Sequence, residues 1–258
     1  MVKVTKRKDQ IMAIVRERGL VAVSDLAEAL GVSTQTVRRD LDDLCNNQKL
    51  RRLHGGVECL EQQVNDPYDL RMATNPDFKC AIANAVSEEI SDGSSIFISI
   101  GSTPTRVAEA LRGKKSLTVM TNNLNAAMVL SSETSNRIII PGGEMRLPDR
   151  DLLGEDVVSF FESYRADFGI FGVAGVDEAG ALLDFHVSEV RVRETIKRNS
   201  RISILVLDST KFGRVAPAAG GNILEMDRVY SDGHLTADYR PLQDQIGERL
   251  FLVGSESE

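Results

Sequence analysis

LVAVSDLAEALGVSTQTVRRDLDDLCNNQKLRRLHGGV, residues 20–57, contains two short helical patterns that meet at a Gly-Val-Ser turn. The first, DLAEALG after Ser24, places its apolar residues on one helical face and stops at Gly31, a residue type that commonly follows a helix. The second, TQTVRRDLDDL, follows Ser33, which is a good N-cap, and its Val and Leu residues recur at i, i+4 and i+7. An earlier segment, DQIMAIVRERG (9–19), has helical spacing and predicts a supporting helix.

In the segment after the second pattern, LRRLHGGV (50–57), apolar and polar residues alternate enough to predict a wing strand closed by a Gly-Gly turn. Helices followed by such a hairpin make a winged helix-turn-helix, a shape that fits the major groove of DNA. Hydroxyl, amide, guanidinium and imidazole groups lie off the buried stripe and in the hairpin, and they suit phosphate oxygens and base edges. Those predicted to contact DNA are Ser33, Thr34, Gln35, Thr36, Arg38, Arg39, Arg51, Arg52 and His54. An ordinary helical hairpin with charged surface helices is the alternative, but the number of parts in the right order favours DNA binding.

Charge is distributed unevenly along the chain. Residues 1–60 carry 11 Lys and Arg against 8 Asp and Glu, whereas the rest of the chain carries 20 against 30. The head is therefore basic and the body acidic, which concentrates positive potential on one lobe as phosphate binding requires. This distribution supports DNA as a partner.

Length, apolar runs and cysteine usage exclude several classes of protein. A chain of 258 residues holds one small and one medium domain. No apolar run approaches the roughly 18 residues of a membrane span, and MVKVTKRKDQ lacks the apolar core of a signal peptide, so we expect a cytoplasmic protein with no membrane partner. Three cysteines and three histidines are too scattered to indicate disulfides or a metal site, and no cofactor is expected. They are Cys45, Cys59, Cys80, His54, His186 and His234.

A linker is predicted over residues 60–76. The segment LEQQVNDPYDLRMATNP is polar, contains two prolines and lacks the regular spacing of apolar residues that marks a helix or a strand. It would separate a DNA-binding domain at 1–59 from a second domain at 77–258. In the second domain, near-continuous runs of Ile, Val, Leu and Phe indicate strands buried on both faces. These strands are 95–100, 117–120, 137–140, 168–173, 202–207 and 229–231, with 249–253 as an added edge strand. The predicted fold class is therefore α/β, a winged helix-turn-helix followed by an open, mostly parallel sheet.

Polar segments follow five of these strands, and the carboxyl ends of the strands in an open α/β sheet share one rim where ligands bind. A Gly-Ser-Thr-Pro segment opens a helix whose backbone N–H groups favour an anion, and Lys and Arg side chains further along would neutralise a phosphate. Each segment alone is typical of a turn or a helix cap, but five on one rim favour an anionic small-ligand site. The residues assigned to it are Gly101, Ser102, Thr103, Asn122, Asn123, Gly143, Glu144, Asp177, Lys211 and Arg214.

The segment STQTVRRDL (33–41), followed by RRLHGG, resembles the DNA-binding signature of the DeoR family of bacterial repressors. The resemblance continues through the Gly-Ser-Thr, Thr-Asn-Asn, Gly-Gly-Glu and Asp-Ser-Thr-Lys segments and covers nearly the whole chain. It implies a second domain similar in fold to ribose-5-phosphate isomerase and glucosamine-6-phosphate deaminase, which senses a phosphorylated sugar or polyol. Four motifs are most similar to the members that respond to glycerol 3-phosphate, so this compound is the expected effector. They lie at residues 100–104, 121–125, 167–170 and 209–214.

An enzyme is the alternative, namely a phosphosugar isomerase or deaminase with an accessory DNA-binding head. In the isomerase, a Lys-Gly-rich segment follows a Gly-Ala-Asp-Glu turn, and the lysine and an acidic residue serve proton transfer. Here GVDE (175–178) resembles the turn, but LDFHVS (183–188) lacks the lysine, and Glu194 has no evident proton relay. We therefore expect a sensor with no catalytic residues, in which Asp184 and Glu189 contact the ligand.

The expected function is that of a repressor of a carbohydrate or polyol operon, which releases its operator DNA when a phosphorylated effector binds. Coupling of this kind between two sites is typically worth about 1–3 kcal/mol. A single winged helix buries too little surface for tight, specific binding to DNA, so we expect a homodimer or a homotetramer.

Overall fold

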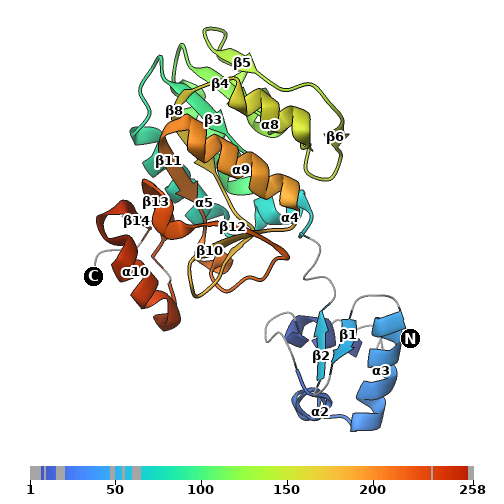
Figure 1. The fold of residues 1–258 in the computed structure, drawn as a ribbon. Helices are drawn as coiled ribbons and strands as arrows, with labels where there is room; N and C mark the ends of the chain where they lie inside the picture. Colours follow the sequence, from blue (N-terminus) through green and yellow to red (C-terminus); the bar gives the residue numbers. More distant parts are fainter. Residues whose placement is uncertain are drawn as a thin grey trace. The chain divides into compact units, whose positions relative to one another are not determined.

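The computed structural model describes residues 7, 8, 10–15, 21–46, 50–53, 56–59, 65–233 and 235–254. The chain divides into two compact units, Met1–Asn65 and Asp66–Glu258 (Figure 1). The first consists of helices and a hairpin, and the second holds a large sheet between helices.

The first unit has a helix-turn-helix core. Its helix α2 spans Val23–Leu30 and its helix α3 spans Thr34–Asn46, while residues 10–15 are also helical. Gly31 ends α2 with a φ of +62°, and the Ser33 hydroxyl accepts a hydrogen bond at 3.2 Å from a backbone N–H in the first turn of α3. Both predicted helix signals are therefore confirmed. The apolar core consists of Ile11, Met12, Val15, Val21, Leu26, Ala27, Val37, Leu41, Leu44, Leu50 and Val57.

The wing is an antiparallel hairpin of β1 (Leu50–Leu53) and β2 (Gly56–Cys59). Gly56 pairs with Leu53 at the end of this ladder and is the first residue of β2, so the predicted Gly-Gly turn was wrong in placing Gly56 between the strands. A glycine is needed there because a Cβ on Gly56 would lie 2.4 Å from the backbone carbonyl oxygen of Val21. The remainder of the predicted turn lies outside the described residues.

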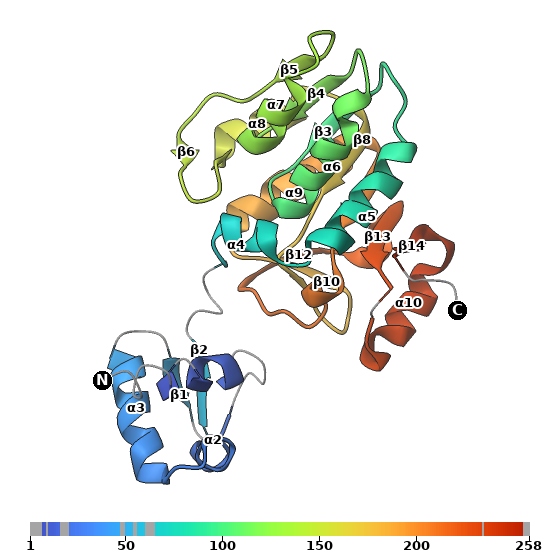
Figure 2. The same cartoon turned by 180° about the vertical axis from the view of Figure 1, so that it is seen from behind.

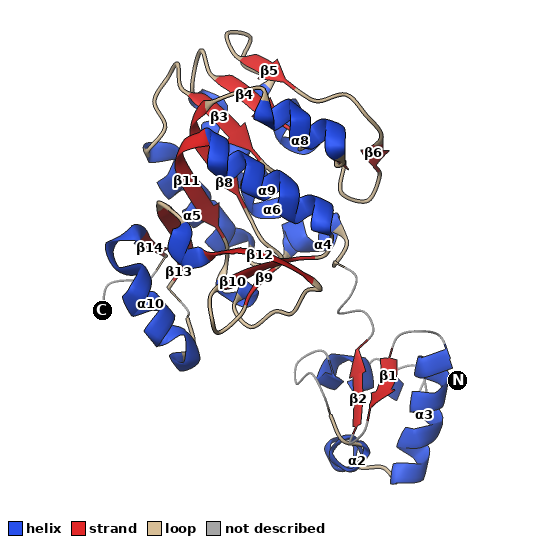
Figure 3. Cartoon of the chain, in the orientation of Figure 1, coloured by secondary structure: helices blue, strands red, loops and turns tan. Residues whose placement is uncertain are grey.

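The second unit is built on a seven-stranded sheet in which all neighbouring strands are parallel (Figure 3). From edge to edge the strands are β14 (Leu250–Val253), β13 (Arg228–Asp232), β11 (Ser200–Val206), β8 (Ala166–Phe171), β3 (Ser95–Ile98), β4 (Thr118–Thr121) and β5 (Arg137–Ile139). All seven predicted strands are confirmed, including the C-terminal one, which forms an edge. The central strands read as nearly continuous apolar runs because both of their faces are buried.

Helices cover both faces of this sheet. Helices α8 (Glu155–Glu162) and α9 (Val187–Asn199) lie on one face (Figure 1), and α5 (Pro76–Glu88), α6 (Ser102–Ala110) and α7 (Leu124–Leu130) lie on the other (Figure 2). Each layer has its own apolar cluster, and together they make the open α/β fold that the sequence predicts. The first cluster includes Phe97, Phe161, Phe171 and Ile196, and the second includes Ile82, Ile96, Val107 and Ile170.

Two small sheets were not predicted. One is antiparallel and consists of β12 (Ala218–Asn222), β10 (Ala181–Asp184) and β9 (Gly175–Val176), and the other pairs β6 (Met145–Arg146) with β7 (Asp151–Leu152). Their strands are only two to five residues long, which is too short to leave a recognisable alternation in the sequence. Helix α10 (Arg240–Ile246) follows the large sheet's strand β13.

The predicted linker is too long at its C-terminal end. Helix α4 spans Tyr68–Ala73 and α5 begins at Pro76, so the second compact unit starts well inside the predicted linker. The Tyr68 side chain is buried, and its hydroxyl donates a hydrogen bond to Thr105 Oγ1 at 3.0 Å. Pro67 is the N-cap residue of α4 and Pro76 is the first residue of α5, so the two prolines of the predicted linker lie at helix starts, where a proline is favourable.

Within the described part of the chain, none of the helices has the length and apolar character needed to cross a lipid bilayer. The same residues contain no group of three or more His, Cys, Asp and Glu side chains that could hold a metal ion.

Candidate functional site

Helix α3 has one buried face and one accessible face. Val37, Leu41 and Leu44 are at most 5% exposed, as the apolar stripe predicts. Most of the polar side chains predicted to contact DNA are accessible. Ser33, Thr34, Gln35, Arg38 and Arg39 are exposed, and Thr36 is half-buried. The accessible face therefore presents two guanidinium groups, an amide and several hydroxyls.

Each acidic residue of α3 is paired with a basic residue. The Asp40 carboxylate is buried and accepts hydrogen bonds from Arg7 Nε at 2.5 Å and from Arg7 Nη2 at 3.1 Å, which raise the pKa of Arg7. The other pairs are Asp42 with Arg52, at 2.6 Å, and Asp43 with Lys8. These pairs offset the negative charges that would otherwise repel a phosphate backbone.

The guanidinium groups of Arg38 and Arg39 form no ion pair with any residue in the described ranges. Arg52, by contrast, holds the wing against α3, because it also donates to the Arg38 carbonyl at 3.4 Å. The Arg51 side chain and the whole of His54 lie outside the described residues. Their contact with DNA stays a prediction, as it does for the residues of α3.

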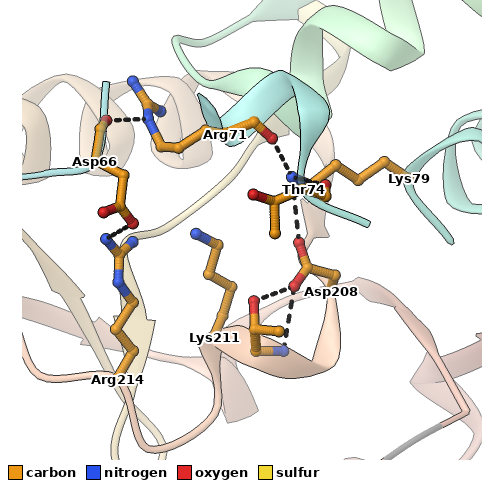
Figure 4. A pocket seen from close by; sticks show the side chains of 8 residues that line it. Asp66, Arg71, Thr74, Lys79, Asp208, Lys211 and Arg214 are labelled. Atoms are coloured by element: carbon orange, nitrogen blue, oxygen red, sulfur yellow. Dashed lines mark hydrogen bonds and ion pairs between the residues drawn. The ribbon is translucent and has the colours of Figure 1, made fainter. Parts of the chain in front are cut away.

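A cavity of about 220 Å³ lies in the second unit (Figure 4). One side of it comes from α4 and the start of α5, and the other comes from the segment that follows β11, including the short 3₁₀ turn η3 (Ser209–Lys211). Its lining residues are Asp66, Arg71, Thr74, Lys79, Asp208, Thr210, Lys211 and Arg214. Four of these are basic and two are acidic, so basic side chains outnumber acidic ones in the lining.

A buried ion pair forms the floor of this cavity. The Lys79 ammonium is 2% exposed, donates to the carbonyls of Arg71 at 2.6 Å and Thr74 at 2.8 Å, and lies 3.6 Å from Asp208 Oδ2. Burial would raise the pKa of Asp208, but the hydrogen bonds from Thr210 and the nearby ammonium groups lower it below its usual value. Asp208 therefore stays ionised and holds the α4–α5 turn on the rim of the sheet.

The remaining cations line the open part of the cavity. The Lys211 side chain points between Arg214 and Asp208 (Figure 4), and its burial, together with the charge of Arg214, lowers the pKa of Lys211 to about 7. Arg214 Nη2 lies 3.0 Å from Asp66 Oδ2, and its guanidinium lies over the Phe185 ring at 5.1 Å from the centroid. Crowding of positive charge in a partly buried space favours the binding of an anion.

Only two of the twelve residues predicted for the effector, Lys211 and Arg214, line this cavity. Gly101, Ser102 and Thr103 lie at the start of α6, where both hydroxyl residues are buried. Asn122 donates to the Leu152 carbonyl at 2.8 Å. Asn123 caps α7 and also donates to Ser99 and Thr105. Gly143 and Glu144 are exposed in the loop between β5 and β6.

The other three predicted residues form hydrogen bonds or ion pairs with neighbouring parts of the second unit. Asp177 closes the turn between β9 and β10 by accepting from two backbone N–H groups, at 3.0 and 2.8 Å. Asp184 is buried against Arg193 at 3.1 Å, and its pKa is raised to about 6 by burial. Glu189 forms a capping box with His186 at the start of α9 and lies 3.0 Å from Arg146 Nη2. For these ten residues, ligand binding stays a prediction.

Six cavity residues were missing from the predicted site. Asp208 and Thr210 stand in the Asp-Ser-Thr-Lys motif beside Lys211, so that motif was the signal for them. Asp66, Arg71, Thr74 and Lys79 lie in or beside the predicted linker, and no sequence signal places this segment at the rim of the sheet. Only the tertiary fold brings it there.

A winged helix-turn-helix and an α/β unit with a cationic cavity together define a DNA-binding regulator that carries a sensor for a small ligand. The family model of the DeoR-like helix-turn-helix domain matches residues 7–63, and that of the DeoR C terminal sensor domain matches residues 74–233. The chain belongs to the DeoR family of transcriptional regulators.

Relatives with established names agree with this assignment. The chain is 43% identical over 230 residues to the glycerol-3-phosphate regulon repressor of Escherichia coli (strain K12), covering 89% of this chain and 91% of the relative. It is 36% identical to the HTH-type transcriptional repressor CsqR of the same organism, covering 88% and 87%. Both relatives are named as repressors, so the chain is a regulator and the isomerase or deaminase alternative is set aside.

Ribose 5-phosphate isomerase A from Methanocaldococcus jannaschii is similar over 55% of this chain and 56% of its own, at 15% identity and a TM-score of 0.39. This likeness is too weak to add to the family assignment.

Proposed function

We propose that the accessible face of α3 binds operator DNA and that the cationic cavity binds a phosphorylated sugar or polyol, which releases the operator. Glycerol 3-phosphate is the first candidate, because a relative 43% identical to this chain is named for it. Such a regulator would act in the cytoplasm on an operon for carbohydrate or polyol breakdown. The observation that carries the proposal is that basic side chains outnumber carboxylates in the cavity, where Lys211 and Arg214 lie side by side.

The cavity's chemistry suits a phosphate monoester. Such an ester carries close to two negative charges at neutral pH, which the cationic side chains of Lys211 and Arg214 would attract. Lys211 and Arg214 supply charge-assisted donors for its oxygens, whereas Arg71 is already paired with Asp149, and the hydroxyls of Thr74 and Thr210 suit the hydroxyls of a polyol. A volume of about 220 Å³ is below the roughly 300–1,000 Å³ of sites for drug-sized ligands, so a small ester is favoured.

Calorimetric titration of the full chain with glycerol 3-phosphate tests this proposal. Fructose, galactitol and deoxyribose phosphates serve as comparison ligands in the same experiment. We expect saturable binding of glycerol 3-phosphate and weaker binding of the others. Tight binding of another ester would change the effector, and no binding of any ester would remove the effector function from the cavity.

The proposed effector affinity should fall as the pH rises above 7. Lys211 has a pKa of about 7, so its ammonium, which attracts the phosphate, is progressively lost at higher pH. The ester itself loses its second proton near pH 6, so its charge is nearly constant from pH 7.5 to 9. Across that range we expect the affinity to fall by up to about tenfold per pH unit.

Binding of the effector at pH 8 should be accompanied by uptake of close to one proton by Lys211. Calorimetry in buffers of different ionisation enthalpy measures this uptake, because the buffer supplies the proton. The variant Lys211→Arg serves as the control, since arginine keeps its charge throughout this range. A pH profile as steep in that variant as in the wild-type chain would assign the titration to another group.

We also propose that the chain self-associates through an apolar groove of about 740 Å³ on the second unit. Met128, Ile140 and Met145 line it and are 74%, 49% and 40% exposed, which is unusual for a cluster of large apolar side chains. Its lining also contains Asp69 and Arg150, whose carboxylate and guanidinium lie 3.7 Å apart within one chain, so these two charges already offset each other when two identical grooves face across a two-fold axis. Pairing of subunits also supplies the second half-site contact that a winged helix needs.

The variant Met128→Glu should shift the chain toward the monomer. A carboxylate in the contact would have to be buried unpaired, so we expect association to weaken by at least about tenfold. Light scattering coupled to gel filtration measures the oligomer over a concentration series. Val187→Glu is the matched control, because Val187 is 66% exposed on α9 and is not among the lining residues of the groove. An unchanged oligomer in Met128→Glu would place the contact elsewhere.

A further inference from the structure

The cavity is lined by two segments that are far apart in the sequence. Residues 66–79, which we name the connector segment, supply Asp66, Arg71, Thr74 and Lys79, and the segment after β11 supplies the rest (Figure 4). The connector segment begins immediately after Asn65, the last residue of the DNA-binding unit. A ligand in the cavity would therefore meet the first residue of the chain that leaves the DNA-binding unit.

Asp66 already places an anion against a cation of this cavity. Its Oδ2 lies 3.0 Å from Arg214 Nη2, and its backbone carbonyl accepts a hydrogen bond from Arg71 Nε at 2.9 Å. The Asp66 side chain is 55% exposed, whereas that of Arg214 is 22% exposed. An ion pair with one partner in solvent is weak, so a better-placed anion can take its position.

The second carboxylate of the cavity is held quite differently. Asp208 is fully buried and accepts from the Thr210 backbone N–H at 3.1 Å, from the Thr210 hydroxyl and from Asn75 Nδ2 at 3.4 Å. Its release would leave the Lys79 ammonium buried without a counterion, which is strongly unfavourable. Of the two carboxylates, Asp66 is therefore the exchangeable one.

We propose that the Asp66 carboxylate is an internal competitor of the effector, occupying Arg214 in the empty state and displaced by the phosphoryl group on binding. This inference rests on the proposed effector function and adds the step by which binding is transmitted. Displacement frees the side chain that anchors the start of the connector segment, next to Asn65. Effector binding and release of this anchor are then a single event, and the coupling to the operator is reciprocal.

The variant Asp66→Asn tests the proposal in the full chain. It removes the competing charge but keeps the backbone carbonyl that Arg71 contacts. We expect it to bind glycerol 3-phosphate, and inorganic phosphate as a second probe, about two- to fivefold more tightly than the wild-type chain, the range of a half-exposed ion pair. The ratio of operator affinities without and with glycerol 3-phosphate should become smaller, because the anchor is already released. Calorimetry measures the first quantity, and fluorescence anisotropy with an operator selected from random DNA measures the second.

Asp77→Asn is the matched control. It removes the same charge from an exposed position in the first turn of α5 that is not among the cavity's lining residues, so it should behave as the wild-type chain does. Unchanged effector affinity in Asp66→Asn would overturn the proposal, and so would tighter binding with an unchanged operator ratio. Absence of binding of either probe to the wild-type chain would instead overturn the proposed effector function and this inference with it. Thermal unfolding of each variant verifies that it is folded.

Discussion

Replacing Lys211 by alanine is expected to raise the effector concentration that releases the operator by roughly 10- to 150-fold, while leaving operator affinity unchanged. The Lys211 side chain points into the cavity beside Arg214 (Figure 4), where its ammonium would contact the phosphoryl group of the effector. A hydrogen bond to a charged group contributes about 1.5–3 kcal/mol, so effector affinity should fall by roughly 10- to 150-fold. Operator affinity should persist because Lys211 belongs to the second compact unit, outside the helix-turn-helix.

Two measurements on the same preparation separate these effects. Calorimetry gives the affinity for glycerol 3-phosphate, and anisotropy of a labelled operator gives its release over an effector titration. Lys115→Ala is the control, since Lys115 is an exposed lysine of the same unit that is not among the cavity's lining residues. If Lys211→Ala responds to the effector as the wild-type chain does, Lys211 is not part of the site.

Replacing Arg38 by alanine is expected to weaken operator binding by about 1–3 kcal/mol, or roughly 5- to 150-fold, if the guanidinium contacts a base edge. Arg38 is exposed on α3 and its side chain forms no ion pair with the described residues, so the substitution breaks no ion pair within the described part of the unit. The buried stripe on the opposite side of α3 is untouched, and the unit should keep its stability. Effector affinity should be unchanged.

Operator titrations at several salt concentrations distinguish the two ways in which Arg38 could contact DNA. Contact with a base edge would lower the affinity for the operator far more than for random DNA, whereas contact with a phosphate would lower both and reduce the salt slope by about one. Arg112→Ala controls for net charge, because it removes an exposed arginine of the second unit. Operator affinity equal to that of the wild-type chain would show that α3 has been assigned to the wrong role.

Much of the fold follows from local patterns in the sequence. Gly31, Ser33 and the stripe from Val37 to Leu44 each act within one helix, so their effect needs no information from distant residues. The seven strands of the large sheet were predictable for a similar reason, because burial on both faces demands continuous apolar runs. The small sheets and helix α4 were missed because their elements are short and their stability comes from packing against the rest of the unit.

The candidate effector site was only partly predictable. Lys211 and Arg214 follow strand β11 of the parallel sheet. Ligands bind at the carboxyl ends of strands in such a sheet, so these two residues could be predicted. Arg71 and Lys79 follow no strand, and their place in the cavity depends on how the connector segment packs against the rim. Asp184 lies at the end of a strand, yet it is held by Arg193. A polar residue after a strand can therefore either bind a ligand or hold the fold together, and its neighbours in space determine which.

The sequence by itself determined that the chain has a DNA-binding head and a parallel α/β body, because helix caps, apolar periods and charge distribution are properties of neighbouring residues. Only the tertiary structure decided which charged groups share a cavity. Electrostatic attraction and desolvation depend on distances of a few ångströms between residues such as Asp66 and Arg214, which lie 148 positions apart in the chain.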